Sequence, residues 1–159
     1  MAAALVYQSD WITGRKQMPT PAGSEVVNVL LSHTMTADEV DALAAADLIV
    51  MGEIPEDCVF VDAICADTDL DSGDALDLDF GIVNAGETDW ATNGELQNSI
   101  LVAGTTHVAR VTPTVEMLTT ASPSTGGTKL GYKVSTAAGT AVAGTIYVSL
   151  SYRAAAFGS

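Results

Sequence analysis

The densest group of side chains that could do chemistry is an acidic loop of sequence DTDLDSGD. Asp67, Asp69 and Asp71 stand at every second position, which is the spacing of the first oxygen ligands in an EF-hand calcium loop. The rest of that pattern is missing, because Gly73 comes one position late and Leu78 stands where the closing glutamate would be. Two interpretations stay open: a looser calcium site, and an ordinary acidic turn.

The other reactive side chains do not form a known catalytic or metal-binding pattern. His33 and His107 lack the spacing of zinc ligands. Cys58 and Cys65, if they share a strand, would lie about 23 Å apart on opposite faces, too far for a disulfide. No serine lies in a nucleophile elbow, and the glycines do not form a phosphate-binding loop. We therefore expect structural histidines, free thiols, no cofactor and no catalytic residue.

Two strand-like runs flank the acidic loop and would position it. In residues 75–83, large apolar side chains alternate with small or acidic ones, so one face should be buried and the other should carry carboxylates. Residues 58–66 are apolar at both parities except near Asp62, which predicts a more central strand. We expect the two runs to form a long hairpin with an acidic tip.

Further strands and one helix are predicted elsewhere. Thr36 and Glu39 have the spacing of a capping box, so a helix of two or three turns should begin there. Residues 84–98 are rich in Gly and Asn and should form a loop around Trp90. The other predicted strands cover residues 25–35, 47–54, 99–103, 106–112, 114–119, 128–136 and 145–152.

These elements predict a mainly β protein with a single domain. A chain of 159 residues with 48% hydrophobic residues is long enough and apolar enough for a core. Eight or nine short strands with one short α-helix are typical of an antiparallel β-sandwich with jelly-roll-like connections. We expect the sandwich over residues 25–159, after an N-terminal arm over residues 1–24 whose two prolines disfavour regular structure.

The charge of the chain limits its partners. The formal net charge is −14, and residues 17–109 hold 18 acidic residues but no lysine or arginine. Direct nucleic-acid binding is not expected, because it depends largely on basic side chains that neutralise phosphates. The N-terminus lacks the pattern of a secretory signal, and no apolar run approaches the roughly 20 residues that span a bilayer. Membrane insertion is therefore not expected either.

Aromatic and basic residues in the arm are candidates for contact with another protein. Tyr7, Trp11, Arg15 and Lys16 lie in this segment, which either reaches a neighbour or lies on its own domain. Trp90 has two similar interpretations, a contact residue and a lid over the edge of the core. The sequence alone leaves both alternatives open.

The segment from residue 43 to residue 83 resembles small structural proteins of tailed bacteriophages, including head decoration (cement) and minor capsid proteins. The shared features are an Ala-rich lead into Asp47, a strand that ends at Ile54 and Pro55, a second strand, and an Asp-Leu-Asp-Ser-Gly turn before an alternating strand. The resemblance implies a non-enzymatic β-domain that assembles in the host cytoplasm. It further implies a homotrimer on the outer capsid surface, bound between subunits of the major capsid protein.

Two other functions stay open. A carbohydrate- or receptor-binding β-domain on the virion surface would need exposed aromatic rings along a groove, with calcium at the acidic loop as an option. A hydrolase on a jelly roll would need two carboxylates that face each other in a cleft.

Overall fold

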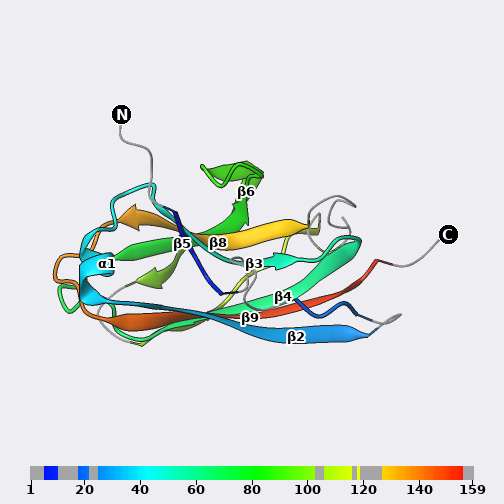
Figure 1. The fold of residues 1–159 in the computed structure, drawn as a ribbon, viewed down its shortest axis with the longest axis horizontal. Coiled ribbons are helices and arrows are strands. Elements are labelled where there is room, and N and C mark those ends of the chain that lie inside the picture. The colour runs from blue at the N-terminus through cyan, green and yellow to red at the C-terminus, as the bar shows by residue number, and fades with distance from the viewer. Residues whose placement is uncertain are drawn as a thin grey trace.

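The structure, a computed structural model, describes residues 6–10, 18–21, 25–102, 106–115, 118 and 127–155. These residues form nine strands and one short helix in two layers (Figure 1). In chain order the elements are β1 (Val6–Gln8), β2 (Val26–Met35), α1 (Ala37–Asp41), β3 (Leu48–Ile54), β4 (Cys58–Asp67), β5 (Asp77–Val83), β6 (Trp90–Val102), β7 (Val108–Arg110), β8 (Thr128–Thr136) and β9 (Gly144–Ala154).

The strands form a five-stranded sheet in the order β1-β3-β8-β5-β6 and a four-stranded sheet in the order β2-β9-β4-β7. Neighbouring strands are antiparallel except β1 and β3, which are parallel. In Figure 1 the five-stranded sheet lies above the four-stranded one, and α1 connects them at one end. The mainly β, single-domain sandwich predicted from the sequence is confirmed.

The core lies between the two sheets and contains large aromatic side chains. Phe80, Tyr132 and Tyr152 are fully buried, and the rings of Phe80 and Tyr132 pack edge to face with centroids 5.3 Å apart. The hydroxyl of Tyr132, in β8, donates a 2.9 Å hydrogen bond to the backbone oxygen of Tyr147, in β9. A buried polar group of one sheet is thereby satisfied by the backbone of the other.

The long hairpin predicted around the acidic loop is wrong. β4 pairs with β9 and β7, whereas β5 pairs with β8 and β6 in the other sheet. The acidic loop therefore crosses between the sheets. Alternation in β5 determines which side chains are buried, but it does not determine the partner strand. The central position predicted for residues 58–66 is confirmed, because β4 lies between β9 and β7.

The helix begins as predicted but is shorter. The N–H of Glu39 donates to Oγ1 of Thr36 at 3.3 Å, and the N–H of Thr36 donates to Oε2 of Glu39 at 2.7 Å, so the capping box is present. The helix covers five residues, which is less than two turns. Ala46, with φ of 80°, and the carboxylate of Asp47, which accepts the N–H of Ala44 at 2.8 Å, turn the chain into β3.

Two further predictions fail in the second half of the chain. The loop expected over residues 84–98 is strand from Trp90 onward. The pairing of β6 with β5 shifts register at three places, which explains why a regular alternation is missing from its sequence. The strand expected over residues 114–119 is wrong at Val115 and Leu118, which are helical, with the Leu118 N–H bonded to the Thr114 oxygen at 3.3 Å.

Candidate functional site

The carboxylate of Asp71, in the acidic loop, is fully buried and is surrounded by backbone donors. Two loops supply these donors, the β4–β5 loop and the β8–β9 loop, and both cross between the sheets. The five N–H groups that donate to Asp71 belong to Gly73 (2.9 Å), Ala75 (2.9 Å), Leu76 (2.9 Å), Gly139 (2.8 Å) and Thr140 (2.6 Å).

These donors control the ionisation of Asp71. Burial alone would raise its pKa, but the N–H groups of Gly139, Thr140, Gly73 and Ala75 outweigh burial and hold the pKa well below its usual range. The carboxylate is therefore ionised at neutral pH, with its oxygens occupied by N–H groups. This arrangement makes Asp71 a structural residue that ties one inter-sheet loop to the other.

The other two aspartates of the calcium hypothesis are also bonded to backbone. Asp67 accepts the N–H of His107 at 2.9 Å, and Asp69 accepts the N–H of Asp71 at 3.1 Å. Burial raises the pKa of Asp67, and this effect outweighs the hydrogen bond from the His107 N–H, which lowers the pKa. In the part of the chain that the structure describes, no group of three His, Cys, Asp or Glu side chains could hold a metal ion. The oxygens of these aspartates accept backbone N–H groups, some of them from distant segments, and the calcium site stays a prediction.

The histidines and cysteines lie in the sandwich body and apart from one another. His33, in β2, is half-buried, its ring centroid lies 6.3 Å from that of Tyr7, and burial lowers its pKa. Cys58 and Cys65 are both buried and free, but the prediction that they face opposite ways is wrong: both belong to the main core, because the register of β4 shifts between them. Burial raises the pKa of the Cys65 thiol to about 12, which leaves it protonated and poorly nucleophilic.

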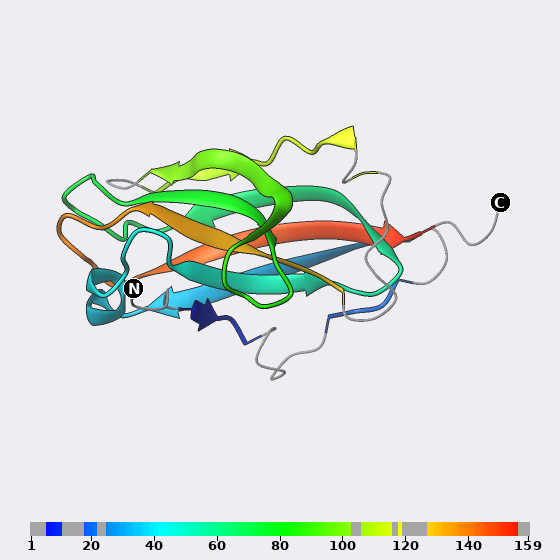
Figure 2. The same ribbon diagram turned by 90° about the horizontal axis from the view of Figure 1, so that it is seen from above.

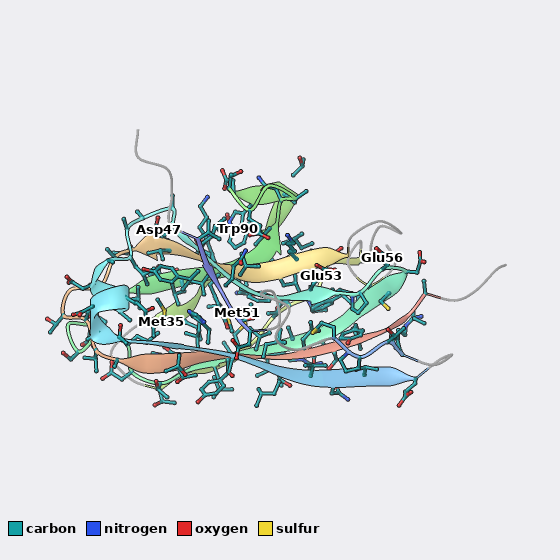
Figure 3. The ribbon with its side chains drawn as sticks, viewed as in Figure 1. Met35, Asp47, Met51, Glu53, Glu56 and Trp90 are labelled. Carbon is teal, nitrogen blue, oxygen red and sulfur yellow. The ribbon has the colours of Figure 1, made fainter. Side chains whose placement is uncertain are left out.

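Trp90 lies at the end of the β5–β6 turn, on the outer face of the five-stranded sheet (Figure 3). We call residues 84–90 the Trp90 hairpin; Figure 2 shows it passing over β8 and β3. The ring of Trp90 packs against Leu48, Val50 and Val83, a small apolar cluster separate from the main core. Trp90 thus covers apolar side chains that point away from the sandwich interior.

Ion pairs attach the Trp90 hairpin to the sheet beneath it. Lys133 donates to Asp89 at 2.6 Å, and its Nζ lies 5.9 Å from the centre of the Trp90 ring. The hydrogen bond from Lys133 lowers the pKa of Asp89. Glu87 accepts hydrogen bonds from Lys129 in β8 and from Gln8 in β1. The hairpin is therefore attached to two strands of the sheet that it covers.

A glycine leaves space for the ring. In β5, a Cβ added to Gly81 would come 2.4 Å from the backbone oxygen of Gly94 and 3.1 Å from Cζ3 of Trp90. Glycine within a strand often marks such a close approach. Residue 81 therefore has no room for a side chain, because the backbone of β6 at Gly94 and the ring of Trp90 both lie against it.

Of the four contact residues predicted in residues 1–24, the structure describes one. Tyr7 lies in β1, opposite Ile49 of β3, and packs against the core. Trp11, Arg15 and Lys16 lie outside the described residues. The described parts of this segment contact the sandwich, since the Tyr152 hydroxyl donates to the Pro19 oxygen at 2.6 Å.

A hydrogen bond from Gln8 to Glu87 joins β1, the strand of Tyr7, to the Trp90 hairpin. Neither Gln8 nor Glu87 was predicted from the sequence as a contact residue. These residues are 79 positions apart and belong to no local pattern that could have signalled the contact. No helix in the described ranges is long and apolar enough to cross a membrane.

No protein-family model and no curated protein matches the chain. A chain in the solved structure of the capsid of Ralstonia phage GP4 matches with a TM-score of 0.72 and 25% identity, over 94% of this chain and 97% of that one. A chain of the cyanophage Pam1 capsid asymmetric unit matches with a TM-score of 0.59 and 19% identity, over 89% and 95%, a likeness of fold alone. The chain therefore shares its fold with chains from phage capsids. The match to the Ralstonia phage GP4 chain supports a structural role in a phage virion.

Proposed function

We propose that this chain is a non-enzymatic structural protein that decorates the outside of a phage capsid and stabilises it by binding between major capsid protein subunits. The observation that carries the proposal is the match to a chain of the Ralstonia phage GP4 capsid. That match covers 94% of this chain and 97% of the other, so it concerns the whole fold and not one motif.

The construction of the sandwich is compatible with this role. Two inter-sheet loops are tied at Asp71, and Tyr132 joins the two sheets through a buried hydrogen bond. A rigid body of this kind loses little conformational freedom on binding, and many weak contacts repeated over a shell add through multivalency. The acidic composition also argues against the packaged nucleic acid as the partner.

Our proposal extends to the residues that make the contacts. Tyr7, Trp11, Arg15 and Lys16 contact the capsid, and the Trp90 hairpin contacts the capsid or a second copy of the chain. The copies form a homotrimer, and assembly takes place in the host cytoplasm. Aromatic and arginine side chains are enriched among residues that dominate binding energy at interfaces, which supports this choice.

Co-sedimentation with capsids that lack this protein tests the proposal. The full chain should pellet with the capsids, and light scattering should give the mass of three copies. A combined Trp11→Ala, Arg15→Ala, Lys16→Ala variant should pellet at least tenfold less. Deletion of residues 1–24 is less suitable, because it also removes β1 and the Pro19 oxygen that Tyr152 binds. A full chain that stays in the supernatant would contradict the proposed function.

A further inference from the structure

The outer face of the four-stranded sheet has very few charged groups for such an acidic chain. Side chains alternate between the two faces of each strand, and the register decides which of them share a face. On this outer face lie the even-numbered residues of β2 and β7, the even-numbered residues of β4 from residue 62 onward, and the odd-numbered residues of β9. We call this set the open face. Its charged members are Asp62, Arg110 and Arg153, whereas the chain as a whole carries −14. Asp62 is already paired, since Arg110 Nε donates to it at 2.9 Å.

Apolar side chains on the open face are exposed. Leu30, Ser149, Ile64 and Arg110 form one row across all four strands. In this row Leu30 is 62% exposed and Ile64 is 39% exposed, and in the next row Val108 is 73% exposed. The face therefore combines aliphatic side chains with serine hydroxyls, and water reaches both.

The outer face of the five-stranded sheet has the opposite character. It carries Lys129 and Lys133, and the Trp90 hairpin covers part of it with Glu87 and Asp89. Among the described residues, the Trp90 hairpin thus covers part of the charged face, whereas the open face has low charge and exposed side chains in β2, β4 and β7. Fully buried parts of protein interfaces are depleted of charged residues, so the open face is the better candidate for a broad contact.

We infer that the open face lies on the protein shell of the capsid; this rests on the proposed function. A second copy docked face to face about a two-fold axis fits less well, because such a contact places the same patch on both sides. Asp62 offsets only one of Arg110 and Arg153, so both patches would carry the same excess of positive charge, and the two chains would each bring a net charge of −14. The proposed homotrimer does not need this contact, because a three-fold interface joins two different surfaces. A neutral or weakly acidic protein surface with apolar side chains complements the open face without that repulsion.

Charged substitutions on the open face test the inference. Leu30→Asp in β2 and Val108→Asp in β7 change exposed side chains on opposite edges of the sheet, so a folding defect in one leaves the other informative. Asn98→Asp, at an exposed position of β6 away from the Trp90 hairpin, adds the same charge elsewhere as a control. In co-sedimentation with capsids, both open-face variants should bind at least tenfold more weakly, and Asn98→Asp should stay within twofold of the unchanged chain.

The outcomes separate this inference from the proposed function. If the unchanged chain does not bind capsids, the proposed function is wrong and the inference fails with it. If the unchanged chain binds capsids and both open-face variants bind as well as it does, the inference alone is overturned. If Leu30→Asp or Val108→Asp lowers the oligomeric mass in light scattering while capsid binding persists, a second copy occupies the open face and the shell does not.

Discussion

Asp71 accepts a 2.6 Å hydrogen bond from the backbone N–H of Thr140, a residue 69 positions further along the chain. Asp71 lies in the loop that leads from the four-stranded to the five-stranded sheet, and Thr140 lies in the loop that leads back. This bond joins two crossings of the sandwich at one buried carboxylate. An aspartate that resembles a metal ligand in the sequence therefore has a structural role in the fold.

Replacing Asp71 by asparagine should destabilise the sandwich by about 2–4 kcal/mol. Asparagine has one acceptor oxygen in place of two, and its NH₂ group would face backbone N–H groups that are themselves donors. Urea unfolding followed by circular dichroism at pH 7 measures the change.

Asp74→Asn is the matched control for this substitution. Asp74 lies in the same loop and is exposed, and its φ of 56° is one that asparagine tolerates. A change within about 0.5 kcal/mol is expected. Equal decreases in the free energy of unfolding for the Asp71 and Asp74 variants would show that charge in the loop, and not the buried hydrogen bonds, stabilises the fold.

The stabilisation by Asp71 should depend on pH in one direction. Its pKa is lowered in the folded chain, so its contribution is fully present above the unfolded value of about 3.9 and is lost as the pH falls through the folded pKa. The difference in free energy of unfolding between the unchanged chain and Asp71→Asn should therefore be largest at pH 7 and smaller at pH 3. A difference that stays constant between these two pH values would contradict the assigned ionisation.

Asp67 should behave in the opposite way. Burial raises its pKa in the folded chain, so ionisation above that pKa costs stability. Asp67→Asn keeps an oxygen that can accept the N–H of His107 and removes the buried charge. The variant should be as stable as the unchanged chain at pH 7, or more stable by up to about 1 kcal/mol. Thermal unfolding at pH 7 measures this, and a clear loss of stability would show that the charge of Asp67 is needed.

The features that the sequence predicted correctly are local ones. Thr36 and Glu39 are three residues apart, so their mutual capping is visible as a pattern, and the alternation around Leu78 and Phe80 identifies a buried face. Partner strands are not local. β4 and β5 are adjacent in the sequence yet lie in different sheets, because alternation is compatible with any partner that offers an apolar face.

The candidate contacts were harder to predict than the strands. Leu48 and Val50 are fully buried although they point outward, because the Trp90 hairpin covers them from more than 30 positions away in the sequence. The open face has no motif at all. It appears only when the register places Leu30, Ile64 and Val108, from three separate strands, on the same outer face of the sheet.

The two cysteines should react slowly with a thiol reagent in the folded protein. Both are buried, and burial raises the pKa of each, that of Cys65 to about 12. Because the thiolate is the reactive form, labelling of native protein with Ellman's reagent should be much slower than labelling in 6 M guanidinium chloride, where two thiols per chain should appear. Rapid labelling of the native chain would show that β4 opens readily.

Packing and ion pairing should contribute unequally to the Trp90 hairpin. Trp90→Ala uncovers Leu48, Val50 and Val83 and should cost about 2 kcal/mol, less than a fully buried tryptophan, because the ring is only partly buried. Lys133→Met keeps the length of the side chain but removes the bond to Asp89, whose side chain is largely exposed, and should cost less than about 1 kcal/mol. Hydrogen exchange of the β3 and β5 amides, with urea unfolding, compares the two variants. If Lys133→Met were the more damaging, the ion pairs and not the ring would hold the hairpin on the sheet.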